Sequence, residues 1–262
     1  MKITILGSSH GDPTPFANQT SVLLEINGKN YLIDAGEGAN SSIVRRNFTA
    51  ADLSAIFITH MHIDHSSSLP VLIEQFVKNR GKNLEKYGKC FLNVALPDPR
   101  AKEAVKNYLI VNSTRGFVDN NGFEIVRFDD ITSSYVYNDN NVKFSFIPTK
   151  HLAHAYPNEE RSFSILVEAE GKKVLFTGDL SASCADFPFE KAKECDLLFS
   201  EFVHFKPESL KSFFADLGKK KVVLYHLATR WQDDKGKEEL LNLFSDLDCE
   251  VTRSYDGYSI EL

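Results

Sequence analysis

The chain has 262 residues, 42% of them hydrophobic and 25% charged, which is typical of a globular protein with room for one large α/β domain. Its 30 basic and 36 acidic residues give a net charge of −6, which argues against a broad polyanion-binding surface. No run approaches the ~18 apolar residues that span a bilayer, and the first residues lack the apolar core of a signal peptide, so we expect a cytoplasmic protein without a membrane partner.

Apolar runs and turn residues predict a first half that is rich in strands. Residues 1–7 read as a first strand, and residues 22–26 and 31–33 as a hairpin around Asn27-Gly28, a favoured turn dipeptide. Further strands are predicted at 55–59, 90–95 and 123–128. Helices are predicted at 38–47, 69–77 and 99–111, the second of them from the helical spacing of its apolar residues.

The second half repeats this mixture of strands and helices. Strands are predicted at 142–148, 162–169, 172–177, 196–200, 221–225 and 257–261, and helices at 186–194, 207–216 and 235–246. The Gly/Asn/Asp-rich segments 119–122 and 138–141 are expected to be turns. Two such halves suggest two sheets packed face to face with helices outside. No domain boundary is visible, so we expect a single domain over residues 1–262.

The segment 59–65 (THMHIDH) directly follows an apolar strand and holds three imidazoles and a carboxylate. Neutral imidazole nitrogen and carboxylate oxygen are ligands of zinc and similar cations. Without a metal the histidines would repel one another when protonated, or crowd polar nitrogens against an apolar strand when neutral. The alternative is a solvated polar turn. The spacing favours a metal site made from His60, His62, Asp64 and His65.

Three further strands each end at a potential ligand, and these residues are His151, Asp179 and His226. Loops that follow strands are where sites are usually built. Taken alone, either histidine would be more typical of the core or the surface, and Asp179 of a turn. Their joint arrangement with the first cluster favours ligation. His154 is the alternative to His151.

The order His-x-His-x-Asp-His, then His, Asp and His, resembles the metallo-β-lactamase superfamily over nearly the whole chain. The segments 7–14 (GSSHGDPT), 32–38 (LIDAGEG) and 226–231 (HLATRW) resemble the ribonuclease Z and phosphodiesterase branch. The resemblance implies a four-layer αββα sandwich of the α/β (α+β) class, with metals at one edge of the two sheets. Gly36 and Gly38, within the second segment, are equally consistent with simple turns.

The resemblance also implies a ligand set for two divalent metal ions, with zinc or manganese expected. It places His60, His62 and His151 on the first metal, places Asp64, His65 and His226 on the second, and makes Asp179 the bridge between them. A hydroxide bridging such a pair would be the nucleophile for in-line attack on a phosphodiester. Asp34, at a strand end, is expected either to orient a ligating histidine or to cap a turn.

Further roles follow from the same resemblance. Asp64 would help to orient the water, and Glu201, with His204, would protonate the leaving oxygen. Ribonuclease Z has a His-Glu-Ala-Thr segment, but Ser200 stands here where its histidine belongs, so His204 would replace it or would be a packing or surface residue. His10 and Arg230 are candidates for phosphate contact.

A tRNA-clamping arm is not evident, because segment 80–86 (RGKNLEK) is short and mixed in charge. This weakens a tRNA substrate, and a small-molecule or oligonucleotide phosphodiester is expected instead. Two alternatives stay open. One is hydrolysis of an ester, thioester or lactone on the same dinuclear centre, and the other is a metal- or nucleic-acid-binding module without turnover. A homodimer is a further expectation from the family.

Overall fold

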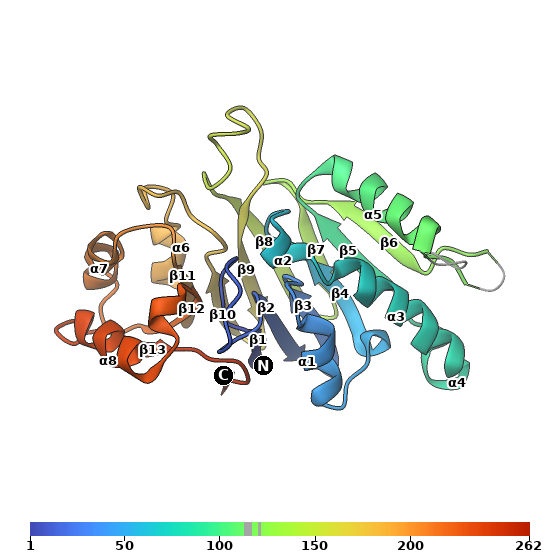
Figure 1. Ribbon diagram of the computed structural model, residues 1–262, viewed down its shortest axis with the longest axis horizontal. Helices are drawn as coiled ribbons and strands as arrows, with labels where there is room; N and C mark the ends of the chain where they lie inside the picture. Colours follow the sequence, from blue (N-terminus) through green and yellow to red (C-terminus); the bar gives the residue numbers. More distant parts are fainter. Residues whose placement is uncertain (113–116, 120–121) are drawn as a thin grey trace.

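The computed structural model describes residues 1–112, 117–119 and 122–262, and these form two seven-stranded sheets that pack face to face (Figure 1). The first sheet has the order β14 (Ser259–Glu261), β1 (Lys2–Gly7), β2 (Ser21–Ile26), β3 (Lys29–Ile33), β4 (Leu53–Phe57), β5 (Leu92–Leu96), β6 (Val126–Asp130). The second has the order β13 (Glu250–Arg253), β12 (Lys221–Leu227), β11 (Leu197–Phe202), β10 (Lys172–Phe176), β9 (Phe163–Ala169), β8 (Val142–Pro148), β7 (Val136–Asp139).

Strands near the centre of each sheet are buried on both faces, which explains their nearly continuous apolar sequences. In β2, Val22 and Leu24 point into the core between the sheets, while Leu23 points to the helices outside. The core between the sheets is rich in aromatic residues. Phe57 of β4 stacks on Phe144 of β8 with ring centroids 4.3 Å apart, so this pair joins the two sheets directly.

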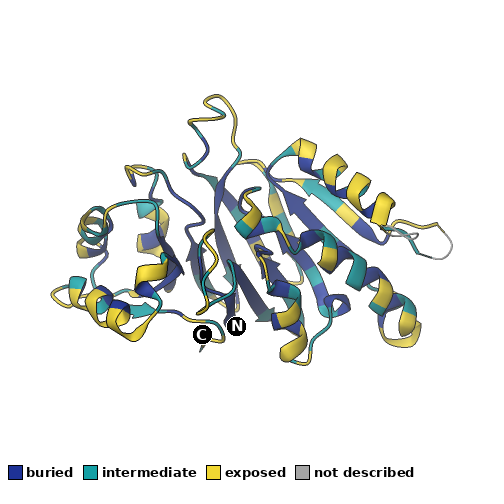
Figure 2. Ribbon diagram, viewed as in Figure 1, coloured by how far each residue is buried: buried dark blue, intermediate teal, exposed yellow. Residues whose placement is uncertain are grey.

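Helices cover the outer face of each sheet, and their exposed sides face solvent (Figure 2). The first sheet is covered by α1 (Ala39–Arg45), α3 (Leu69–Lys82) and α5 (Pro99–Asn112), and the second by α6 (Phe189–Glu194), α7 (Pro207–Ala215) and α8 (Asp234–Leu243). Short turns of helix occur at α2 (Ile63–Ser66), α4 (Leu84–Tyr87), η1 (Ala50–Asp52) and η2 (Thr229–Trp231). The four-layer αββα sandwich is therefore confirmed. Within the described ranges, no helix is long and apolar enough to cross a membrane.

The topology brings several strand ends to one edge. β3, β4, β5 and β6 run parallel to one another, and so do β10, β11, β12 and β13. Parallel strands present their carboxyl ends on the same side. The residues that follow β3, β4 and β10, as well as the ends of β11 and β12, can therefore meet at this edge.

Most predicted elements are found. Two differ in extent from the prediction, and one lies partly outside the described residues. The predicted turn 138–141 is shorter, because β7 reaches Asp139 and only Asn140 and Asn141 turn, with φ of 48° and 66°. For the predicted turn 119–122, the N–H of Gly122 donates to the carbonyl of Asp119, but residues 120–121 lie outside the described residues. The strand predicted to end at 225 continues to Leu227, so His226 lies within β12 rather than after it.

Candidate metal centre

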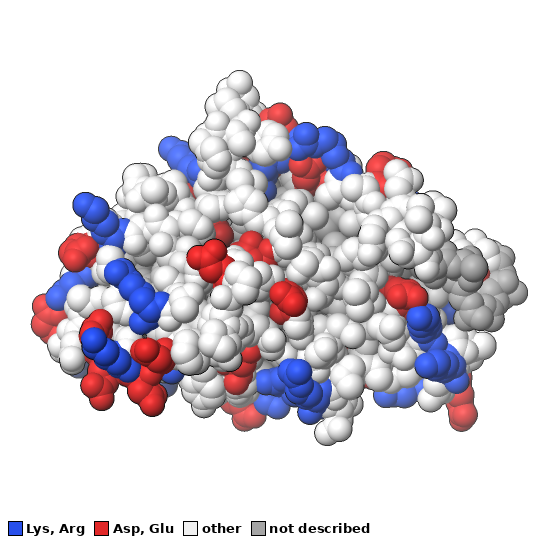
Figure 3. All heavy atoms as spheres, in the orientation of Figure 1, with Lys and Arg blue, Asp and Glu red and all other residues white. Residues whose placement is uncertain are grey.

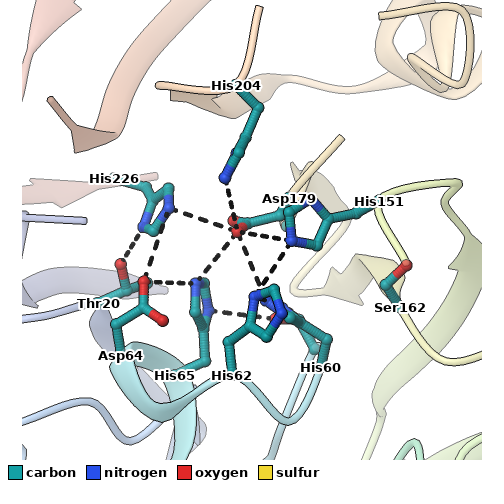
Figure 4. A network of polar contacts seen from close by, with 12 residues as sticks. Thr20, His60, His62, Asp64, His65, His151, Ser162, Asp179, His204 and His226 are labelled. Atoms are coloured by element: carbon teal, nitrogen blue, oxygen red, sulfur yellow. Dashed lines mark hydrogen bonds and ion pairs between the residues drawn. The ribbon is translucent and has the colours of Figure 1, made fainter. Parts of the chain in front are cut away.

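The seven side chains predicted as ligands converge at the edge where these strands end (Figure 4). His60 and His62 lie in the loop after β4, while Asp64 and His65 lie on α2. The other three, His151, Asp179 and His226, come from the segment after β8, the segment after β10 and β12 itself.

Three overlapping groups of potential ligand atoms occur among the described residues. Two of them, called here the first and second groups, contain the seven predicted ligands, and the third consists of Asp179, His204 and His226. His60, His62, His151 and Asp179 each offer an atom within 4.8 Å of the others, and so do Asp64, His65 and His226. In the first group, His62 Nδ1 lies 2.9 Å from His60 Nε2 and 3.2 Å from His151 Nε2. In the second group, Asp64 Oδ2 lies 3.6 Å from His65 Nε2 and 4.0 Å from His226 Nε2. This grouping coincides with the two metal positions that the sequence resemblance implies.

Asp179 lies between the two groups. Its Oδ2 is 3.4 Å from Nε2 of both His65 and His226, 3.5 Å from Nε2 of His60 and 3.7 Å from Nε2 of His151. The side chain is 2% exposed. One carboxylate oxygen therefore faces histidines of both groups, which is the position that a bridging ligand requires.

The loop after β4 is held against the segment after β3. The N–H of Ala35 donates to the carbonyl of His65 at 2.7 Å. Gly36 allows this close approach, because a Cβ on Gly36 would lie 2.2 Å from the backbone oxygen of Asp64. Segment 32–38 thus has a steric role at the site, which the reading of Gly36 as a simple turn residue did not anticipate.

A β-bulge directs His226 into the site. On β11, Glu201 and Phe202 pair with Tyr225 and Leu227 of β12, so His226 is the extra residue. Its φ is 50°, in the left-handed region. Bulges redirect a side chain and often lie beside functional sites. This conformation is not visible in the strand-like sequence around His226.

Asp34 orients His65, the first of the two roles expected for it. Its Oδ2 accepts from His65 Nδ1 at 2.8 Å, while its Oδ1 accepts from the backbone N–H of Thr59 at 2.8 Å. Asp34 is fully buried and has a φ of 59°. Because Nδ1 of His65 is engaged in this way, its Nε2 is the nitrogen that faces Asp64 and Asp179.

The donor set fits a bound divalent cation. Among the described residues, Nε2 of His65 and Oδ1 of Asp179 are buried without a hydrogen-bond partner. A buried polar atom left unpaired costs about 1–3 kcal/mol. These are the atom types that zinc and related cations bind, so an ion at this site would supply the partner that both atoms lack.

The charged groups of the cluster shift one another's pKa. Burial lowers the pKa of His60 well below its ordinary range, and the neighbouring His65 lowers it further. Burial by itself would lower the pKa of His65 and raise the pKa of Asp179. The charges of Asp179 and Asp34 nevertheless raise the pKa of His65, while those of His226, His65 and His60 lower the pKa of Asp179. A deprotonated Asp179 beside a neutral His60 suits the site for a cation.

His204 also faces the cluster, with Nε2 3.7 Å from Asp179 Oδ2 (Figure 4). Its Nδ1 lies 3.0 Å from Oε1 of Glu201, which is fully buried. Although burial lowers it, the hydrogen bond and charge of Glu201 raise the pKa of His204 to about 9. His204 thus lies at the cluster and contacts both Asp179 and Glu201, and its replacement of the missing histidine stays a prediction. Ser200, in contrast, is buried and donates to the backbone oxygen of Glu201.

The remaining predicted residues differ in their placement. His10 lies beside the cluster, with its ring centroid 6.5 Å from that of His226, and its Nε2 accepts from the N–H of Thr229. Arg230 is exposed and its guanidinium lies over Trp231, so phosphate contact by this residue remains a prediction. His154 is exposed, whereas His151 faces Asp179, which favours His151 as the ligand.

Comparisons with known proteins agree with this architecture. The family model described as "Anti-Pycsar protein Apyc1" matches residues 1–248. A ribonuclease Z from Prochlorococcus marinus (strain AS9601) is 29% identical over 163 residues, covering 60% of this chain and 48% of that protein. The chain spans about a third to a half of the length of the ribonuclease Z relatives that it matches first.

Two solved structures share the fold over almost their entire length. The metallo-β-lactamase fold protein YhfI from Bacillus subtilis has a TM-score of 0.72 and 17% identity, with 99% of this chain and 98% of that one covered. The short form of human tRNase Z has a TM-score of 0.71 and 23% identity, with 100% and 99% covered. The fold implied by the sequence resemblance is therefore confirmed.

Proposed function

The chain belongs to the Anti-Pycsar protein Apyc1 family, and from this membership, the metallo-β-lactamase fold and the donor cluster we propose that it is a metal-dependent phosphodiesterase. The observation that carries the proposal is the position of Asp179, whose Oδ2 faces histidines of both ligand groups. A relative named ribonuclease Z supports a phosphodiester as the bond that is cleaved.

We assign the metal-binding roles as the grouping suggests. His60, His62 and His151 would hold one divalent ion, Asp64, His65 and His226 would hold a second, and Asp179 would contact both. Such ions, zinc or manganese, lower the pKa of a bound water toward neutrality and offset negative charge on phosphoryl oxygens. Asp64 is 13% exposed and lies at the accessible side of the cluster, where it would help to orient the attacking water.

Protonation of the leaving oxygen is assigned to His204, with Glu201 as its positioning residue. The carboxylate of Glu201 accepts from three backbone N–H groups, those of Leu180, Val203 and His204, as well as from His204 Nδ1. In all four contacts the carboxylate acts as an acceptor, which suits it to hold the histidine in position. The His204 imidazole is 29% exposed, has a raised pKa and points its Nε2 at the cluster, as a general acid must.

His10 is proposed to contact the phosphate. Burial and the nearby His226 lower the pKa of His10, which favours the neutral ring. Because its Nε2 accepts from the N–H of Thr229, the proton of the neutral ring lies on Nδ1. Nδ1 is then a donor available to a phosphate oxygen. Arg230 stays a candidate for the same role, although its guanidinium lies over Trp231 in this structure.

The surface supports a small phosphodiester, or a short oligonucleotide, over tRNA. In Figure 3 most Lys and Arg side chains lie toward the periphery, and the centre of this face is largely uncharged with a few acidic groups. Segment 80–86 folds within α3 and α4, where Arg80 is 7% exposed and donates to the carbonyl of Cys90. It therefore does not form an extended clamp. We also propose that residues 1–262 act as one hydrolase domain, because both sheets contribute ligands.

The proposal is tested with purified protein loaded with Mn²⁺ or Zn²⁺. Bis-p-nitrophenyl phosphate, a cyclic mononucleotide and a short oligoribonucleotide are offered beside p-nitrophenyl acetate, a thioester and a lactone panel. We expect metal-dependent cleavage of the phosphodiesters, which a chelator and the Asp179→Ala substitution both abolish. His154→Ala is the matched control and should retain activity.

Two other results would favour the alternative functions. Turnover of carbonyl substrates alone would show that the same centre serves an ester, thioester or lactone hydrolase. Two bound metal ions with no hydrolysis of any substrate class would indicate a non-catalytic binding module. The hydrogen bond between Glu201 and His204 argues against a non-catalytic module, because a site that only binds metal does not need a proton donor held in position.

A further inference from the structure

We propose that Thr20 is a positioning residue that fixes a proton of His226 on Nδ1 and so makes Nε2 the nitrogen that faces Asp64 and Asp179. The consequence for metal binding rests on the proposed function, but the position of the proton does not. Thr20 lies immediately before β2 and is fully buried, 206 residues from His226 in the sequence. The residue was not among the candidates that the sequence indicated.

The hydrogen bonds of Thr20 determine the direction of its contact with His226. Its Oγ1 donates to the carbonyl oxygen of Ser9 at 2.9 Å and lies 2.5 Å from His226 Nδ1. A threonine hydroxyl has one hydrogen and two acceptor lone pairs. Because the hydrogen is committed to Ser9, the oxygen accepts from His226, and Nδ1 must carry a proton. This holds for the neutral Nδ1–H tautomer and for the imidazolium, and excludes the neutral Nε2–H tautomer.

The surrounding backbone keeps this acceptor in place. Ser9 forms isolated bridges with Gln19 and with Leu227, the neighbours of Thr20 and His226. The N–H of Leu227 donates to the carbonyl of Ser8 at 2.8 Å. Backbone contacts of Ser8 and Ser9 therefore hold the residues next to Thr20 and His226 together.

A second threonine repeats the arrangement in the other ligand group. Thr59 Oγ1 donates to Asp34 at 3.0 Å and lies 3.2 Å from His60 Nδ1. The carboxylate is the stronger acceptor and takes the hydroxyl hydrogen, so the oxygen accepts from His60. Each group therefore has a threonine that assigns Nε2 of one histidine to the cluster. Thr20 is the cleaner one to test, because Thr59 also supports Asp34 and His65.

The experiment compares Thr20→Val, which keeps the shape and removes the acceptor, with Thr20→Ser, which keeps the hydroxyl. Thr4→Val is the matched control, because Thr4 is buried in β1 and bonds Ser259. Long-range ¹H–¹⁵N correlation spectra of metal-free protein with ¹⁵N-labelled histidine report the tautomer, with His226→Gln assigning the signals. Equilibrium titration with Zn²⁺ or Mn²⁺ reports affinity.

We expect a protonated Nδ1 on His226 in the wild type, Thr20→Ser and Thr4→Val, and its loss in Thr20→Val. Thr20→Val should also lower the affinity for one of the bound metal ions by roughly 10–100-fold, whereas Thr20→Ser should keep near-native affinity. An unprotonated Nδ1 in the wild type would overturn the inference, and so would a loss in Thr20→Ser as large as that in Thr20→Val, because the hydroxyl would then not be what fixes the proton. If the spectra show the expected Nδ1 proton but the wild-type protein hydrolyses no substrate, the proposed function is contradicted and the inference about Thr20 stands.

Discussion

His204 and Glu201 form a fixed pair, with Nδ1 of the imidazole 3.0 Å from Oε1 of the carboxylate. The carboxylate is fully buried, whereas the imidazole is partly exposed and reaches the cluster. The sequence left the roles of the two residues combined, and this arrangement supports the proposal that Glu201 positions His204 while His204 donates the proton. The predictions below test this pair, the ligand set and the scaffold that supports them.

Glu201→Gln should lower the pKa of His204. Burial lowers the pKa of His204, but the hydrogen bond and charge of Glu201 raise it to about 9, so loss of that charge should bring it down. NMR titration of the metal-free protein measures this. Because the acid must be protonated, the alkaline limb of kcat should move to lower pH in the variant. If the alkaline limb of kcat does not move, His204 is not the proton donor.

The same pKa has a consequence for stability. A group whose pKa is raised on folding stabilises the folded state fully below its unfolded pKa. For His204 this contribution is present below pH 6.5 and is lost as the pH rises through about 9. The free energy of unfolding of the metal-free wild type, relative to Glu201→Gln, should therefore decrease over this interval. A constant difference would contradict the assignment.

His151→Ala and His154→Ala should differ sharply. His151 Nε2 lies 3.2 Å from His62 Nδ1 within the first ligand group, whereas His154 is exposed. We expect His151→Ala to lower metal occupancy and activity by orders of magnitude, and His154→Ala to leave both near wild type. Elemental analysis of the purified variants measures the occupancy. The reverse result would exchange the two histidines in the proposed ligand set.

Gly36→Ala should damage the metal site without unfolding the chain. The added Cβ would lie 2.2 Å from the backbone oxygen of Asp64 and 2.8 Å from Gln19, so the ligand loop must move. Gly171→Ala is the control, because its φ is 73° but nothing lies within 4 Å of the added Cβ. The control should cost about 1 kcal/mol of stability through backbone strain and retain metal affinity. Metal titration and urea unfolding separate the two effects.

Phe144→Ala should destabilise the protein by about 3–5 kcal/mol, because the ring is fully buried and stacks on Phe57 between the sheets. Phe123→Ala, at a residue that is 68% exposed, should change stability by no more than about 0.5 kcal/mol. Urea unfolding measures both. Equal effects would show that the contact between the sheets contributes little to the scaffold that carries the ligand loops.

Metal binding should raise the melting temperature. The buried Nε2 of His65 and Oδ1 of Asp179 gain a partner, and an ion at 100 times its dissociation constant adds about 2.7 kcal/mol. Differential scanning fluorimetry with and without Zn²⁺ or Mn²⁺ should show an upward shift that EDTA reverses. Asp179→Ala should abolish it. A shift that persists in this variant would place the ion elsewhere.

The sequence by itself determined the broad fold and the set of candidate ligands. Apolar periodicity is local, so it revealed most strands and helices, and the spacing of His60, His62, Asp64 and His65 within one loop indicated metal chemistry. The hairpin at Asn27 and Gly28 was equally accessible, because its turn conformation depends on these two residues. The fold that the resemblance to the metallo-β-lactamase superfamily implied is confirmed.

Only the tertiary structure decided how these groups act on one another. Thr20 meets His226 across 206 residues, and no local pattern encodes a contact between positions so far apart. The bulge at His226 depends on register with β11, and the roles proposed for Glu201 and His204 depend on which backbone N–H groups surround the carboxylate. Side-chain type limits what a site can bind, but hydrogen-bond geometry, which folding alone creates, assigns each atom its role.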